Sequence, residues 1–332
     1  MTLDPVAPLT AVILTFNEEK HIGRCLDSIR SLCAKIVVVD SGSTDRTVEL
    51  ARARGAEVHT RPWPNKYAEQ LNYAIDVAAA TTPWMLRIDA DEYLTPELVA
   101  ELQRTLAMAP DDVGGFIVPR LVMFQKKPIR FGGFYPQWLL RVWRTGLGRA
   151  EERAMDEHML LAAGRTVRLR GRLVDQNEND IFWWTEKHNR YARREAADVI
   201  ALRHGLQRGT DERSSAAAPA RRPAGPAGMK RWIKENVYVR LPLGLRALLY
   251  FFYRFFLRLG FLDHPRVWVF HFLQAAWYRV LVDVNVREFE DAVGRASRER
   301  KLAFLAERWG VRLELPAPAR GAEGQSAGRP TQ

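Results

Sequence analysis

The chain has 332 residues, 47% of them hydrophobic and 27% charged, which excludes a disordered protein and allows one large domain with an appendage. The net charge of +11 favours an anionic partner, such as a nucleotide-sugar, an anionic membrane surface or nucleic acid. The only two cysteines, Cys25 and Cys33, lack CxxC spacing, which argues against a disulfide framework or a zinc site and indicates a reducing compartment. Met1–Pro8 has no features of a signal peptide.

Short apolar runs alternate with helical patterns along the first hundred residues. Strands are predicted at 9–15, 34–40, 57–61 and 84–89, and helices through Leu32 and at 46–54 and 66–80. Alternation at short intervals is typical of right-handed βαβ units, so a mostly parallel sheet flanked by helices is expected.

Polar residues follow three of these strands, where an open α/β sheet binds its ligands. Thr15 leads into Asn17 and Glu18, and Asp40 leads into the turn Ser41–Asp45. Asp40 could accept hydrogen bonds from a base or a ribose. For Ser43 and Thr44 alone, capping of the following helix is the simpler role.

The fourth strand ends in Asp89-Ala90-Asp91-Glu92. Alternate side chains of a strand point the same way, so Asp89 and Asp91 could share one direction. Oxygen-only ligands suit Mg²⁺ or Mn²⁺, which also bind substrate phosphates. The alternative is that Asp89 and Glu92 are surface charges at a strand end, followed by a helix cap at Thr95.

Taken together, three motifs resemble glycosyltransferase family two of the GT-A fold, in particular the bacterial branch that includes lipopolysaccharide-core beta-glucosyltransferases. They are Thr15–Glu19, Val39–Asp45 and Asp89–Glu92, and the resemblance continues through Trp183–Ala192. It implies a GT-A fold, that is, a Rossmann-like, mostly parallel sheet flanked by helices.

The resemblance also implies a nucleotide-sugar donor, usually linked to uridine diphosphate, and a Mg²⁺ or Mn²⁺ ion. By position, the nucleotide-sugar would be bound by Thr15, Asn17, Glu18, Asp40 and Asp89, and the metal by Asp91 and Asp89. Many members have a second acid after Asp40, where this chain has Ser41, so base recognition is expected to differ.

Inverting transfer needs a carboxylate that takes the proton from the attacking hydroxyl. The family places this base in the region of Met155–Leu160, so Glu157 is the first choice and Asp156 the second. The alternative is a charged surface loop.

Two further residues are candidates for the acceptor side. Arg141, in a strand predicted at 137–143, could face a phosphate or a structural carboxylate. His188 shares one face of a helix predicted at 182–204 with Trp184, Tyr191 and Glu195. This face could form the floor of a sugar-binding site, although a histidine in such a position more often has a packing role.

The C-terminal part follows a flexible linker or loop predicted at 209–228. Residues 229–310 form the expected basic, aromatic helical region, and 311–332 a disordered tail. A helix predicted at 242–260 carries Arg246, Arg254 and Arg258 on one side and Leu and Phe residues on the other. Such helices suit the interface of an anionic membrane; alternatively, they pack their aromatic face on the catalytic domain and only the arginines meet solvent.

The sequence therefore predicts a GT-A domain at 1–208, with a nucleotide-sugar half (1–115) and an acceptor half (116–208), and a C-terminal helical appendage. The expected function is inverting, metal-dependent sugar transfer to a lipid-linked glycan of lipopolysaccharide or exopolysaccharide, at the inner face of the plasma membrane, with no nucleic acid. The alternatives are a sugar-phosphate nucleotidyltransferase and a non-catalytic membrane or nucleic-acid binder.

Overall fold

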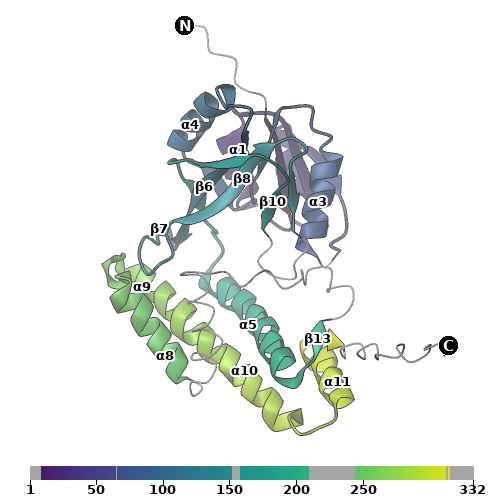
Figure 1. Ribbon diagram of the computed structural model, residues 1–332, viewed down its shortest axis with the longest axis vertical. Coiled ribbons are helices and arrows are strands. Elements are labelled where there is room, and N and C mark those ends of the chain that lie inside the picture. Colours follow the sequence, from purple (N-terminus) through teal and green to yellow (C-terminus); the bar gives the residue numbers. More distant parts are fainter. Residues whose placement is uncertain (1–8, 65, 152–157, 209–243, 312, 315–332) are drawn as a thin grey trace, which may run out of the picture.

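The computed structural model describes residues 9–64, 66–151, 158–208, 244–311 and 313–314. A unit built on a large sheet contains the first part of the chain, and a group of long helices lies below it (Figure 1).

The first half of the sheet is parallel, as the alternating strand and helix patterns predict. β1 (Leu9–Thr15) lies between β2 (Cys33–Asp40) and β4 (Trp84–Arg87), and β3 (Glu57–Thr60) pairs with β2. The register sets Thr15 opposite Asp40, so these polar strand ends meet at one edge. The helices between these strands are α1 (Ile22–Ile29), α2 (Thr47–Ala53) and α3 (Tyr67–Val77).

The second half of the sheet is mixed. β8 (Gln137–Arg144) runs antiparallel to both β4 and β6 (Val113–Phe124), and β12 (Leu173–Asp175) joins β6 to β5 (Glu92–Leu94). The smaller strands are β7 (Lys127–Pro128), β9 (Gly148–Ala150), β10 (Met159–Leu161) and β11 (Arg165–Arg168). The predicted fold class, a mostly parallel sheet flanked by helices with C-terminal helices appended, is confirmed.

The sheet has an apolar layer on each face because its strands alternate. Ala11 and Ile13 of β1 pack in a core with α1 and α4 (Pro96–Ala107), whereas Val12 packs on the other side with α3. Cys25 lies on the buried side of α1, where burial raises the pKa of its thiol. Thr95 caps α4 by accepting a hydrogen bond from the Leu98 N–H at 3.3 Å, as predicted.

A second core joins segments that are far apart in the sequence. α5 (Ile181–His204) packs Ala192, Ala196 and Ile200 against α10 (Tyr278–Val293) and α11 (Arg298–Trp309). α5 therefore packs with the C-terminal helices, although the sequence assigned it to the acceptor half of the first domain. β14 (Leu313–Glu314), which the sequence assigned to a disordered tail, pairs with β13 (Gln207–Arg208). The predicted linker at 209–228 lies outside the described residues.

The predicted helix at 242–260 is described from residue 244 as α8 (Leu245–Phe252), a π-helical segment η2 (Tyr253–Leu257) and a 3-10 turn η3 (Gly260–Leu262). Its arginines do lie opposite its exposed apolar residues, but Arg246 and Arg254 point into the protein. Arg246 pairs with buried Asp283 of α10, with Nε 2.9 Å from Oδ2. The alternative in which aromatic residues pack inward and only arginines meet solvent is therefore wrong.

Instead, apolar side chains form the outer surface of this region. α9 (Pro265–Phe272) follows η3 and leads through a π-helical segment, η4 (Leu273–Trp277), into α10. We call the exposed apolar residues of α8, η2, η3 and α9 the α8–α9 apolar face: Leu245, Leu248, Leu249, Phe252, Phe256, Leu257, Leu259, Phe261, Leu262, Trp268, Val269 and Phe272. In the described part of the chain, no helix has the length and apolar character needed to cross a membrane.

The C-terminal helices are held to the sheet unit at the β6–β7 hairpin. Phe124 and Ile129 pack against Val267 and Phe270 of α9. Buried Asp263 accepts hydrogen bonds from the Arg130 and Phe131 N–H groups at 2.9 and 3.2 Å, and His271 Nε2 lies 2.9 Å from the same carboxylate. In Figure 1, α9 lies directly at the tip of this hairpin.

Candidate functional site

The two loops that follow β1 and β2 are hydrogen-bonded to each other. Asn17 adopts a left-handed conformation (φ 56°), its N–H donates to Ser43 Oγ at 2.8 Å, and its side-chain oxygen accepts from the Thr44 N–H at 2.9 Å. The Glu18 N–H donates to Thr47 Oγ1 at 2.7 Å. The predicted Thr15–Glu19 and Ser41–Asp45 segments thus form one continuous rim.

The buried carboxylate of Asp40 holds this rim in place through hydrogen bonds. It is 1% exposed, and its carboxylate accepts hydrogen bonds from Thr15 Oγ1 (2.9 Å) and the Gly42 and Ser43 N–H groups (3.0 and 2.8 Å). Capping of α2 by Ser43 and Thr44 was a wrong expectation, because Asp45 accepts the Thr47 N–H at 2.9 Å. The predicted contact of Asp40 with a base or ribose remains a prediction.

Glu18 lies at the centre of the rim. Its Oε2 is 2.6 Å from Nδ1 of buried His21, whose Nε2 accepts the Glu178 N–H at 2.8 Å. Burial raises the pKa of Glu18; the His21 hydrogen bond opposes this rise and the nearby Asp91 carboxylate adds to it. His21 was not recognised from the sequence, where nothing distinguishes it from a packing residue.

Asp89 does not continue a strand, because β4 ends at Arg87 and residues 89–92 form a turn closed by the Glu92 N–H donating to the Asp89 carbonyl at 2.9 Å. The strand alternation expected for Asp89 and Asp91 is therefore wrong. The Asp89 carboxylate accepts from Tyr67 Oη at 2.9 Å and lies 3.3 Å from Arg141 and 3.5 Å from Arg87. Burial would raise its pKa, but the two guanidinium groups outweigh this effect and keep the pKa well below its ordinary range.

Glu92 is buried at 1% exposure, so the alternative of a surface charge is wrong for this residue. Its carboxylate accepts from Arg141 Nη2 at 2.6 Å and from the Asp89 N–H at 3.0 Å. Burial raises the pKa of Glu92 to about 8, with Arg141 opposing and Asp89 adding to the rise. Of the two partners considered for Arg141, a phosphate or a structural carboxylate, the structure shows carboxylates.

Asp91, the second predicted metal ligand, has fewer described partners than Asp89. Its Oδ2 accepts from Asn177 Nδ2 at 3.2 Å, and its main-chain carbonyl accepts from the Gln176 N–H at 3.0 Å. Within the described ranges, no group of three or more His, Cys, Asp or Glu side chains is arranged to hold a metal ion. One or two carboxylates would suffice for Mg²⁺, which usually completes its shell with water and substrate phosphates.

A further carboxylate, half-buried Asp175 at the end of β12, was missed because nothing in the sequence connects it to Asp89. Arg120 Nη1 lies 3.5 Å from Asp175 and 3.8 Å from Glu92, and Arg120 also donates to Gln137 Oε1 at 2.5 Å through Nη2. Burial raises the pKa of Asp175 to about 6, with Asp91 adding to the rise and Arg120 opposing it. A polar network therefore runs from the β4 end to the start of β8.

His188 packs between α5 and α10. Its ring stacks on Trp184 with centroids 3.5 Å apart, its Nδ1 donates to the Trp184 carbonyl at 2.8 Å, and Tyr278 of α10 meets it edge-on. Burial lowers the pKa of His188, and Lys187 adds to this effect. Of the α5 face predicted to form the floor of an acceptor site, His188 and Glu195 contact α10, whereas Tyr191 is 37% exposed. A contact of this face with an acceptor stays a prediction. The predicted bases Glu157 and Asp156 lie outside the described residues.

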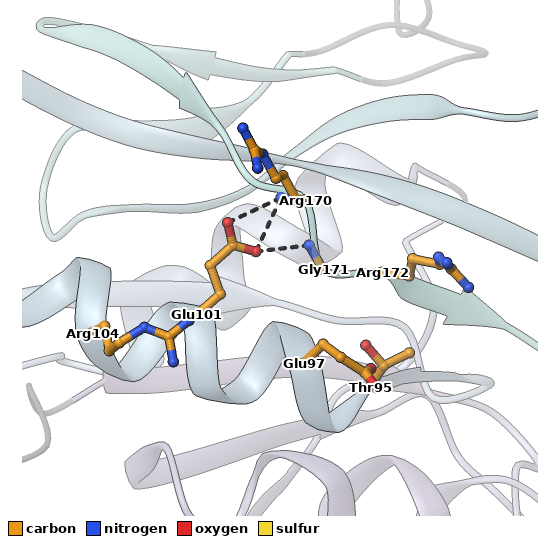
Figure 2. A pocket seen from close by; sticks show the side chains of 7 residues that line it. All are labelled: Thr95, Glu97, Glu101, Arg104, Arg170, Gly171 and Arg172. Atoms are coloured by element: carbon orange, nitrogen blue, oxygen red, sulfur yellow. Dashed lines mark hydrogen bonds between the residues drawn. The ribbon is translucent and has the colours of Figure 1, made fainter.

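Two cavities lie away from this centre. Figure 2 shows one of about 570 Å³ beside α4, where Glu101 accepts hydrogen bonds from the Arg170 and Gly171 N–H groups. It adjoins Thr95 and Arg172, at the opposite end of β5 and β12 from the carboxylates. The second, of about 340 Å³, is named here the Gly132 cavity; it is lined by Gly132, Gly133, Phe134, Gln137, Tyr250, Tyr253, Arg254 and Arg258.

Comparison with known proteins places the strand-end site inside a recognised family region. Residues 10–154 match the family model described as glycosyl transferase family 2. The lipopolysaccharide core biosynthesis glycosyltransferase LpsC of Rhizobium meliloti (strain 1021) is 37% identical over 156 residues, covering 44% of this chain and 54% of that protein. An uncharacterized glycosyltransferase of Rickettsia bellii (strain RML369-C) is 38% identical over 104 residues, covering 31% of this chain and 34% of that protein.

The chain thus spans about half, or less, of the length of these curated relatives. Among solved structures, glucosyl-3-phosphoglycerate synthase from Mycobacterium tuberculosis, in complex with Mn²⁺, uridine diphosphate and glucosyl-3-phosphoglycerate, is 27% identical. The match covers 35% of this chain and 44% of that chain, with a TM-score of 0.29.

Proposed function

Because residues 10–154 are a glycosyltransferase family 2 domain, we propose that the protein transfers a sugar from a nucleotide-diphosphate sugar, with uridine diphosphate as the carrier, to a lipid-linked glycan. The observation that carries this proposal is the convergence of the β1, β2 and β4 ends on Asp89 and Asp91. The family match also favours sugar transfer over nucleotidyl transfer or non-catalytic binding.

The donor would lie against the rim made by the two bonded loops. Thr15, Asn17 and Asp40 hold this rim in shape through hydrogen bonds, which leaves its main chain and Glu18 to contact the nucleotide. A rim that is already ordered loses little conformational entropy on binding. Thr15 and Asp40 would then act mainly by positioning the rim.

The reaction proposed is a single displacement with inversion. The acceptor hydroxyl oxygen attacks the anomeric carbon and forms the new glycosidic bond, while the bond from that carbon to the diphosphate oxygen breaks and its electron pair leaves with the nucleoside diphosphate. The hydroxyl proton passes to a carboxylate, for which Glu157 is proposed first and Asp156 second.

A divalent cation, Mg²⁺ or Mn²⁺, would neutralise the charge of the departing diphosphate when bound. Asp91 fits as a ligand because Asn177 is the one side-chain partner described for its carboxylate. Asp89 fits less well, because Tyr67, Arg87 and Arg141 already surround it. We therefore propose Asp91 as the principal ligand and Asp89 as the residue that fixes the turn.

The acceptor and the location are proposed from the relative and from the C-terminal helices. LpsC is named for lipopolysaccharide core biosynthesis, and the α8–α9 apolar face is a surface that lipid could cover. We propose a peripheral position at the inner face of the plasma membrane, with a lipopolysaccharide or exopolysaccharide intermediate as acceptor.

Calorimetric titration with uridine diphosphate and its sugars, with and without Mn²⁺, tests the donor site. Asp91→Ala is expected to abolish the Mn²⁺-dependent part of binding, because it removes the principal ligand. Asp111→Ala, at a fully exposed carboxylate of the same unit, is the control and should bind like wild type. Binding that is equally strong without metal, or in Asp91→Ala with metal, would remove the proposed role of Asp91.

A further inference from the structure

The Gly132 cavity contains a buried cation, Arg254. This residue is 6% exposed, its Nε donates to the Gly132 carbonyl at 2.8 Å, and its Nη2 has no hydrogen-bond partner in the described part of the chain. Its Cζ lies 4.1 Å from the centre of the Phe134 ring. Among the described residues, no acidic side chain lies within ion-pair distance of it.

A second guanidinium reaches the same cavity from the next turn. Arg258 is exposed, and a Cβ atom on Gly133 would lie 3.4 Å from its guanidinium. Burial lowers the pKa of Arg254; Tyr250 opposes this effect, and the like charges of Arg279 and Arg258 add to it. Because burying an unpaired cation is costly, this arrangement favours an anion in the cavity.

The same cavity borders the α8–α9 apolar face. Tyr253 lines the cavity and is 43% exposed, and Phe256 and Leu257, one turn further along η2, are 47% and 65% exposed. The cavity is also lined by Gln137, which Arg120 connects to Glu92 and Asp175. An anion site here would therefore adjoin both an apolar surface and the polar network of the candidate transfer site.

We propose that the Gly132 cavity binds the phosphate group of a membrane lipid anion, with the lipid hydrocarbon against the α8–α9 apolar face. Guanidinium groups are the usual protein partners of phosphate, and apolar side chains beside them suit the acyl region. Arg254 and Arg258 supply the charge, and Phe256 and Leu257 the hydrocarbon contact. This inference deepens the membrane part of the proposed function.

The test is vesicle sedimentation of the full chain, without donor sugar or metal, so that the result is independent of donor binding. Phosphatidylcholine vesicles are compared with phosphatidylcholine vesicles containing phosphatidic acid. Wild type should prefer the latter, and Arg258→Gln should weaken that binding roughly fivefold, the effect of one arginine near an anionic surface. Arg266→Gln, an exposed arginine of α9 outside the cavity, is the charge-matched control.

The apolar contact has its own variant. Leu257→Glu should weaken binding to both vesicle types, whereas Val284→Glu, at a 55% exposed position of α10, should not. Equal effects of Arg258→Gln and Arg266→Gln would overturn the cavity assignment. Calorimetry with inorganic phosphate distinguishes the source: Arg258-dependent phosphate binding without recruitment to either vesicle would overturn the lipid assignment in favour of a soluble anion.

Discussion

At the scale of single residues, the pair of Arg141 and Glu92 shows how a charged residue can belong to the framework of a site. Both side chains are almost fully buried and lie 2.6 Å apart. Arg141→Gln is expected to lower the free energy of unfolding by about 1–3 kcal/mol, because it takes a buried hydrogen-bond donor away from Glu92 and Asp89. Urea unfolding of the purified variants measures this loss.

The double variant Arg141→Gln/Glu92→Gln serves as the control for this pair. Replacing both side chains should restore part of the lost stability, because the Glu92 carboxyl group no longer lacks its donor. A double variant as unstable as the sum of the two single variants would contradict the buried-pair account.

At the scale of elements, α5 packs His188 into its contact with α10. Because the pKa of His188 is lowered in the folded state, the unfolded chain binds the proton more readily as the pH falls through about 6.5, and this site loses stability there. His188→Phe keeps an aromatic ring but removes the proton. The variant should therefore show a smaller loss of unfolding free energy than wild type between neutral pH and pH 5.

Thermal or urea unfolding at several pH values checks this expectation. Parallel pH profiles for wild type and His188→Phe would show that His188 contributes nothing to the acid sensitivity. An acceptor role would instead appear as a change in transfer rate at constant stability, so both readouts are needed.

At the scale of the whole molecule, Asp263 joins the helical unit to the sheet unit. Asp263→Ala removes the acceptor of the Arg130 and Phe131 N–H groups, and a loss of about 1–3 kcal/mol per unsatisfied buried group is expected. Because these bonds cross between units, calorimetry should show the single unfolding transition broaden or divide. Asp291→Ala, at an exposed position of α10, should leave the transition unchanged.

Much of the fold followed from the sequence because strand and helix periods are local properties. The strands ending at Thr15 and Asp40, and the cap at Thr95, were predicted from adjacent residues alone. The direction of the α8 arginines was not, because a period identifies which residues share a face but not which face meets the protein. Asp175 and His21 were missed for a related reason: only the tertiary fold brings them to the site.

The packing of α5 on α10 and α11 has a consequence for modularity. The last part of the chain is not an independent unit, because four of the twelve buried residues of its core precede position 205. A truncation after residue 208 would leave Ala192, Ala196 and Ile200 uncovered, and the C-terminal segment alone would lack the same partner. A domain boundary that keeps this core intact lies before Asp180. Recombination between related chains would therefore have to exchange α5 together with the helices that follow it.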